Sequence, residues 1–237
     1  MEETGNYLHL SGILTDTPTY GHEVFGEKFY YATLAVPRLS GAEDNLPITL
    51  SERLMEGIDL QIGTPLCLEG QLRSYNKVVE GSGRLLITGF AQRLLDPNTE
   101  ENPNQVQLTG ALCKMPSYRT TPFGREIADL MLAVNRAYGK SDYIPCITWG
   151  RTARFASHLK VGDKVTLIGR FQSRAYQKQL SDGTVVGKTA YEVSVSRLSM
   201  ADQAPIQPTV PFVMPATDDM VLGASMATDP AGFGNAQ

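Results

Sequence analysis

The sequence predicts an all-β protein made of two copies of one small barrel, and three observations support this prediction. First, the segment NYLHLSGIL, which begins at Asn6, recurs 98 residues later as NQVQLTGAL, which begins at Asn104. Second, short apolar runs separated by glycine-containing turns fill both halves, as expected of strands. Third, each half has room for one short helix. A self-match this long indicates two domains rather than a solenoid, whose repeats are shorter.

The elements can be justified in chain order in the second copy. Val106–Leu112 alternates apolar and polar residues, as expected of a strand with one buried face. Four more apolar runs follow: Ile127–Val134, Ile144–Trp149, Val165–Phe171 and Tyr191–Val195. A helix is expected from about Thr152 to Leu159, because its small and apolar residues recur on roughly one face.

Five strands with a helix between the third and fourth is the order of an OB-fold, a small Greek-key barrel. We therefore predict two tandem five-stranded OB-folds. Copy one spans residues 1–95, with a shorter helix near Ser51–Glu56, and copy two spans residues 104–199. Residues 96–103 are polar and bounded by prolines, which is typical of a linker. Residues 200–237 lack periodicity and basic residues and are predicted to be disordered.

Charge is divided unequally among these segments. Residues 1–98 contain 7 Lys/Arg and 13 Asp/Glu, a net charge of -6, whereas residues 99–199 contain 14 and 8, a net charge of +6. The tail contributes the remaining -4. A basic domain between acidic segments indicates a polyanion partner for copy two, although charge alone is equally consistent with a solvated basic surface.

The residue types that carry catalysis are sparse. Cys67, Cys113 and Cys146 lack metal or redox spacing, and the histidines lack metal-ligand spacing. His9 is expected on a strand surface and His158 at a helix end. No phosphate loop or nucleophile elbow occurs, so no enzyme activity, metal or cofactor is expected. The odd cysteine count, with no apolar leader or bilayer-length run, favours the cytosol and no membrane association.

Aromatic and basic side chains concentrate in copy two. Tyr143 and Trp149 lie six residues apart, which places both on one face of a regular strand. The other aromatics and the accompanying cations are Tyr138, Tyr176, Arg136, Lys140, Arg151, Arg170, Arg174 and Lys178. Such a surface suits single-stranded nucleic acid, whose bases stack on aromatic rings beside cations that neutralise the backbone. The pattern alone favours a core position for Trp149 and surface positions for Tyr138 and Tyr176.

Four segments of copy two, in order and with suitable gaps, resemble successive motifs of the bacterial single-stranded DNA-binding protein family, SSB. They are Asn104–Leu112, Leu132–Arg136, Ile147–Ala153 and Gly169–Arg174. The resemblance implies that Tyr138, Tyr143, Trp149 and Tyr176 stack on bases, which moves Trp149 to the surface. It also implies DNA contacts by Arg119, Arg151 and Arg174. Arg136, Arg170 and Lys178 are expected to steer the backbone.

Copy one keeps the framework of this family without its binding residues. At the 98-residue offset, Ser40, Asn45 and Ser51 replace Tyr138, Tyr143 and Trp149, and only Tyr75 is available to stand in for Tyr176. Two departures lie outside copy one. Gln105 replaces the usual basic residue of the first strand, and the chain lacks the acidic tip closed by Pro-Phe through which the family recruits enzymes.

The predicted function is sequence-independent binding of single-stranded DNA by copy two, with copy one as a structural partner, in nucleoid-associated replication, recombination or repair. The family assembles four folds, so two folds per chain predict a homodimer. One alternative is an OB-fold accessory of replication restart or recombination, or a phage or plasmid SSB, that acts mainly through protein contacts. Another is a structural pair that binds protein and no nucleic acid.

Overall fold

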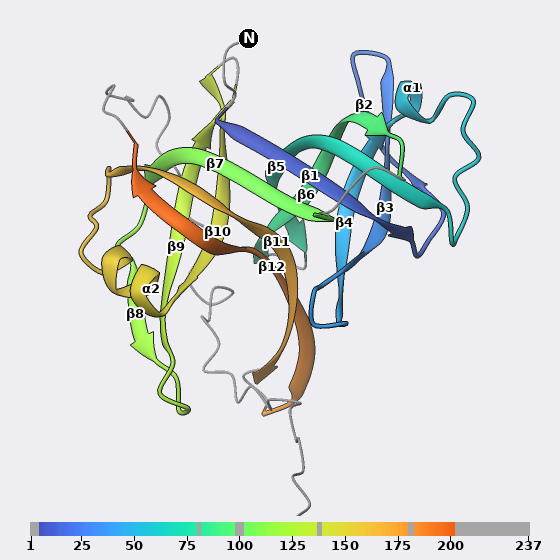
Figure 1. The fold of residues 1–237 in the computed structure, drawn as a ribbon. Helices are drawn as coiled ribbons and strands as arrows, with labels where there is room; N and C mark the ends of the chain where they lie inside the picture. Colours follow the sequence, from blue (N-terminus) through green and yellow to red (C-terminus); the bar gives the residue numbers. More distant parts are fainter. Residues whose placement is uncertain (1–4, 80–81, 98–101, 137–138, 180–182, 202–237) are drawn as a thin grey trace, which may run out of the picture.

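The structure is a computed structural model that describes residues 5–79, 82–97, 102–136, 139–179 and 183–201 (Figure 1). Tyr138 and residues 202–237 of the predicted tail lie outside the described residues, as do residues 98–101 of the predicted linker. The chain forms two tandem OB-folds rich in strand, as the sequence predicts.

Among the described residues, each copy contributes six strands and one short α-helix. Copy one contains β1 (Asn6–Leu14), β2 (Thr19–Val24), β3 (Glu27–Pro37), β4 (Glu43–Ser51), α1 (Glu52–Met55), β5 (Pro65–Val79) and β6 (Ser82–Leu95). Copy two contains β7 (Asn104–Leu112), β8 (Ser117–Thr120), β9 (Glu126–Asn135), β10 (Ser141–Trp149), α2 (Gly150–Ala156), β11 (Lys164–Gln179) and β12 (Val185–Met200). The sixth strand, β2 or β8, is a short hairpin partner of β3 or β9 that the sequence did not predict.

The helix of copy two lies between the third and fourth long strands, as predicted, but its bounds differ. The helix was predicted from about Thr152 to Leu159, whereas α2 already begins at Gly150 and ends at Ala156. Gly150 adopts a φ of 52°, which favours glycine and lets the chain turn directly from β10 into the helix. Trp149 is consequently both the end of the strand and the N-cap residue.

A repeated glycine allows the first strand of each copy to close its barrel. β1 pairs with β5 and then bends to pair with β3, and β7 does the same with β11 and β9. A Cβ atom on Gly12 would lie 2.2 Å from the carbonyl oxygen of Ala35, and one on Gly110 would lie 2.3 Å from that of Ala133. Only glycine permits this approach of two backbones, which explains its place in both copies of the repeat.

The repeated asparagine that opens each copy is a second structural device. The Asn6 side chain donates to the carbonyl oxygen of Leu72 at 2.7 Å and accepts from its N–H at 2.9 Å. Asn104 makes the same two bonds with Phe171, at 2.7 and 2.9 Å. Both pairs hold the start of the first strand against the fourth long strand.

The two copies join through their first strands. β1 pairs antiparallel with β7, with Asn6 opposite Leu108 and Leu10 opposite Asn104, so all twelve strands form one sheet (Figure 1). The prediction for His9 is corrected: it is only 3% exposed, and its Nε2 lies 3.9 Å from the buried Sγ of Cys67. The buried apolar side chains of both copies form one continuous core.

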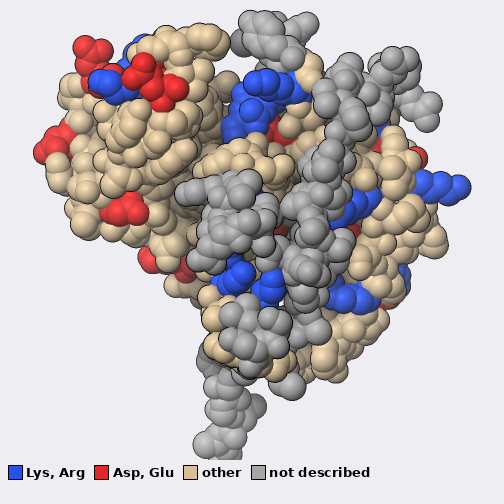
Figure 2. Space-filling view, turned by 180° about the vertical axis from the view of Figure 1, so that it is seen from behind, with Lys and Arg blue, Asp and Glu red and all other residues tan. Residues whose placement is uncertain are grey.

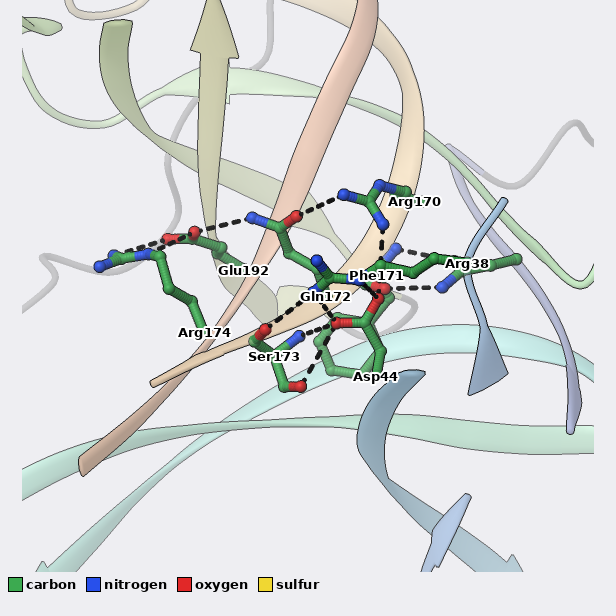
Figure 3. A network of polar contacts seen from close by, with 9 residues as sticks. Arg38, Asp44, Arg170, Phe171, Gln172, Ser173, Arg174 and Glu192 are labelled. Atoms are coloured by element: carbon green, nitrogen blue, oxygen red, sulfur yellow. Dashed lines mark hydrogen bonds and ion pairs between the residues drawn. The ribbon is translucent and has the colours of Figure 1, made fainter. Parts of the chain in front are cut away.

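Ion pairs tie copy one to the long hairpin β11–β12 of copy two. The buried carboxylate of Asp44 accepts a hydrogen bond from Arg38 Nε at 2.7 Å and another from the backbone N–H of Ser173 at 2.8 Å. Arg170 adds a longer contact to the same carboxylate at 3.4 Å. Figure 3 shows these groups converging on Asp44 from β11 and from copy one.

The same arrangement recurs with the two copies exchanged. Asp142 accepts hydrogen bonds from Arg136 Nε at 2.6 Å and from the backbone N–H of Ser74 at 2.5 Å, and Arg73 approaches it at 3.3 Å. Arg136 also donates to the carbonyl oxygen of Ser74 at 2.9 Å. The copies are therefore related by an approximate two-fold exchange at their junction. This identifies Ser74 and Ser173 as equivalent positions.

Candidate single-stranded nucleic-acid interface

Two aromatic side chains stand on the outer face of β10. Asp142, Ile144, Cys146 and Thr148 are buried, so the strand alternation turns Tyr143 and Trp149 away from the core. Trp149 is 40% exposed at the end of the strand and Tyr143 is half-buried. The surface position of Trp149, which the family resemblance implied against the local pattern, is confirmed.

The third aromatic lies on the long hairpin. Arg174, Tyr176 and Lys178 share one face of β11 and are half-buried, whereas the residues between them are exposed on the other face. Tyr176 lies opposite Lys188 of β12. Figure 1 shows this hairpin running down past the body of the molecule. Tyr138, the fourth predicted stacking residue, lies outside the described residues.

The predicted cations differ in their positions and partners. Arg151 is exposed at the start of α2 and has no carboxylate partner among the described residues, and Lys178 lies on the hairpin beside Tyr176. Arg136 and Arg170 bind the junction carboxylates Asp142 and Asp44. Burial lowers the pKa of Arg170. These two guanidinium groups therefore hold the copies together, a role that the sequence reasoning missed.

Arg119 and Arg174 also have carboxylate partners. Arg119 pairs with Asp129, and Arg174 Nε donates to Glu192 at 3.0 Å, a bond that raises the pKa of Arg174. Burial raises the pKa of the Asp129 carboxyl above its ordinary value. Figure 3 shows Arg174 reaching Glu192, which also accepts a hydrogen bond from Gln172. Part of the positive charge of this face is thus neutralised locally.

The two copies differ visibly in surface charge. Figure 2 shows Asp and Glu gathered over copy one, and Lys and Arg over the middle of the molecule and copy two. The positions equivalent to the copy-two aromatics are polar: Ser40 and Asn45 are exposed and Ser51 is buried. Tyr75 follows Ser74 as Arg174 follows Ser173, so Tyr75 is the counterpart of Arg174. The expectation that it would stand in for Tyr176 is wrong; Lys77 holds that position.

Copy one nevertheless contains aromatic residues in another place. His22 stacks on Phe29 with ring centroids 5.1 Å apart, and its Nδ1 lies 3.0 Å from the hydroxyl of Tyr31. Phe29 contacts Phe90 at 5.6 Å, and Arg73 lies over the Phe90 ring at 5.7 Å. The run Phe29-Tyr-Tyr31 is visible in the sequence, but only the folded sheet brings it to Phe90.

The described part of the chain was also searched for metal sites and membrane-spanning helices. It contains no group of three or more His, Cys, Asp or Glu side chains that could hold a metal ion. None of its helices has the length and apolar character needed to cross a membrane.

The fold and this surface define the class: a tandem OB-fold protein with an aromatic and basic face on its second domain. Residues 103–201 match the single-strand binding protein family. The single-stranded DNA-binding protein of Bacillus cereus is 33% identical over 141 residues, which cover 56% of this chain and 74% of that protein. The chain therefore belongs to the single-strand binding protein family.

Further relatives support the same family. Single-stranded DNA-binding protein A of Bacillus subtilis is 41% identical over 83 residues, which cover 32% of this chain and about half, 48%, of that protein. The crystal structure of the single-stranded DNA binding protein from Thermus aquaticus, in a deletion mutant, matches with a TM-score of 0.62 and 25% identity. That match covers 86% of this chain and 98% of the other, so it includes both OB-folds.

Proposed function

We propose that the protein binds single-stranded DNA without sequence specificity and protects it at the nucleoid during replication, recombination or repair. The observation that supports this most strongly is the exposed Trp149 on the same strand face as Tyr143. Two residues later lies the exposed cation Arg151, which has no carboxylate partner among the described residues. Each base offers a π-face to such rings, and stacking requires no particular sequence. The protein acts by binding alone, without catalysis or a cofactor.

The roles of the predicted residues differ. Tyr143, Trp149 and Tyr176 stack on bases, together with Tyr138. Arg151 and Lys178 neutralise phosphates directly. Arg119 and Arg174 reach the strand from their ion pairs with Asp129 and Glu192, so each must exchange a carboxylate for a phosphate. Arg136 and Arg170 mainly position the two copies and add positive potential at the junction.

The chain is proposed to form a homodimer with four OB-folds. This chain covers nearly the whole length of the Thermus aquaticus relative. That match supports a chain with two OB-folds as the repeating unit of the assembly. Sedimentation should give the mass of two 25.9-kDa chains. A mass of one chain would exclude this assembly.

The alternative is an accessory that acts through replication or recombination proteins, which the acidic surface of copy one favours. Fluorescence anisotropy of labelled oligo-dT, with unlabelled single-stranded and duplex competitors, separates the two. The proposal requires tight binding of the labelled oligo-dT. Unlabelled single strands should displace it and duplex should not, and the affinity should fall as salt rises. Absence of binding at low salt would favour the accessory role.

A further inference from the structure

Copy one has a pocket at the end of its barrel, lined in part by residues of α1, which we call the end pocket. It has a volume of about 680 Å³. Its apolar lining consists of Tyr30, Met55, Ile58 and Leu60, of which Ile58 is 47% exposed. Helix α1 has only four residues and buries none of their side chains, whereas α2 has seven and packs two alanines into the core. The shorter helix therefore leaves apolar surface open at this end of copy one.

Three carboxylates line the same pocket beside one guanidinium. The carboxylates belong to Glu27, Glu52 and Glu56, and the guanidinium belongs to Arg53. Oε1 of Glu27 is buried and has no hydrogen-bond partner among the described residues, since Arg53 Nε lies 3.9 Å away. Glu52 pairs with Lys28 at 3.1 Å, whereas Glu56 is exposed and has no ion pair within the described part of the chain. A cation supplied from outside would give these carboxylates the donors that they lack.

The corresponding residues of copy two have the opposite charge. At the 98-residue offset, Arg125 stands for Glu27 and Arg154 stands for Glu56. Arg154 lies in α2 and donates to Glu126 at 2.6 Å. The acidic character of the end pocket is therefore not part of the framework that the two copies share.

A feature of complementary chemistry projects from copy two: the tip of the β8–β9 hairpin, residues 121–125. Phe123 at this tip is 69% exposed, and Pro122 and Arg125 are exposed beside it. The N–H of Thr121 donates to the carbonyl oxygen of Arg125 at 2.8 Å, and the N–H of Arg125 donates to the hydroxyl of Thr121 at 3.0 Å. The hairpin tip thus presents an aromatic ring and a cation on a turn that is closed by two hydrogen bonds.

The hairpin tip and the end pocket lie at opposite ends of the molecule. Figure 1 shows α1 at the upper right and the β8–β9 hairpin at the lower left. The tip therefore faces other chains rather than the pocket of its own chain. Residues 200–237 do not suit the pocket, because they contain four Asp and no Lys or Arg.

We propose that the hairpin tip of one chain docks in the end pocket of a second copy of the protein. Phe123 packs on the apolar lining, and Arg125 binds the carboxylates of Glu27 and Glu56. The contact buries an exposed ring and joins the acidic copy one to the basic copy two. It is heterologous, because two different surfaces meet, and it leaves one tip and one pocket free for further chains. The contact is additional to the proposed homodimer and uses none of the residues assigned to DNA.

Sedimentation equilibrium of the full chain without DNA tests this contact. At low salt the mean mass should rise with protein concentration beyond the two-chain assembly, and high salt should reverse the rise because it screens the ion pairs. Phe123→Ser or Arg125→Glu should weaken the association about tenfold. Leu39→Ser is the matched control, because Leu39 is fully exposed in copy one and lies outside the end pocket.

An exchange of charges makes the test specific. Glu56→Arg should weaken the association, and its combination with Arg125→Glu should restore it, because a guanidinium in the pocket then meets a carboxylate on the tip. Glu43→Arg, the same change at an exposed position outside the pocket, should have no effect. A wild-type mass that is independent of concentration, or a double variant that does not regain the association, would overturn the contact. Failure to bind oligo-dT would overturn the proposed function without changing this result.

A labelled peptide identifies the occupant of the pocket. The anisotropy of a fluorescein-labelled cyclic peptide of residues 117–127 should rise when the wild-type chain is added, and much less when the Glu56→Arg variant is added. No binding to the wild type, together with a constant mass, would exclude a second copy and leave the pocket to a basic segment of another protein.

Discussion

The two copies have the same framework but different faces. They share the glycine that closes the barrel, the asparagine that fixes the first strand and the aspartate that binds the hairpin of the other copy. They differ where β10 ends in Trp149 and β4 ends in Ser51. Residues that join the copies are therefore retained in pairs, whereas the residues on the predicted binding faces have diverged.

The largest expected effect concerns the junction aspartates, which both copies share. Asp44→Ala and Asp142→Ala should each lower the free energy of unfolding by about 2–4 kcal/mol, because each leaves partly buried guanidinium groups without their carboxylate. The two losses should be similar, since the junction is nearly symmetrical. Urea unfolding followed by circular dichroism measures them. A loss below about 0.5 kcal/mol in either variant would show that the pair is no more than a surface contact.

The next largest effect concerns the end of β10 and of β4, where the two copies differ. Trp149→Ala should weaken oligo-dT binding by about 1–3 kcal/mol, which is the stacking free energy of one base. Ser51→Ala changes the equivalent position of copy one and should leave affinity unchanged. It should also leave stability nearly unchanged, since the buried Ser51 hydroxyl has no hydrogen-bond partner among the described residues. Anisotropy titrations compare the two, and equal losses would remove the distinction between the faces.

A smaller effect concerns one charge. Arg151→Gln should reduce the slope of log affinity against log salt by about 0.7, the value for one phosphate contact on a single strand. Arg53 occupies the equivalent position in copy one, where it lies 3.9 Å from Glu27. Arg53→Gln should not change the slope. An unchanged slope for Arg151→Gln would remove this residue from the interface.

The smallest effect is the part of the alkaline pH dependence that Tyr75 of copy one contributes. The pKa of Tyr75 is raised to about 12, mainly by burial, whereas an unfolded tyrosine ionises near pH 10. Between these values the unfolded chain loses a proton that the native chain retains, so stability falls as pH rises. Tyr75→Phe should make this fall shallower. An identical pH dependence of unfolding in both proteins would contradict the raised pKa.

The sequence alone was sufficient to predict the framework of two OB-folds, because the repeat and the strand patterns can be read directly from the order of the residues. It was insufficient where neighbours come from elsewhere in the chain. His9 was predicted to be a surface residue, because nothing near it indicates that β1 lies inside the twelve-stranded sheet, between β5 and β7. Arg136 and Arg170 appeared to be free cations, because each depends on a junction that only the fold creates.

The binding residues show the same limit. Periodicity favoured a buried Trp149, and the family motif was needed to place it on the surface, where the structure has it. The aromatic cluster of copy one escaped prediction because Phe29 and Phe90 are far apart in the sequence and meet only across the sheet. Helix α2 begins two residues early because Gly150 permits a turn that the pattern does not reveal.

The most direct test of the central claim uses the single tryptophan, which lies in copy two. Its fluorescence is followed while oligo-dT is added at low and high salt. Saturable quenching that weakens with salt is the predicted result, because Trp149 then meets the bases on a surface held partly by phosphate contacts. A flat response at low salt, together with no mobility shift of the labelled strand, would contradict single-stranded DNA binding by copy two.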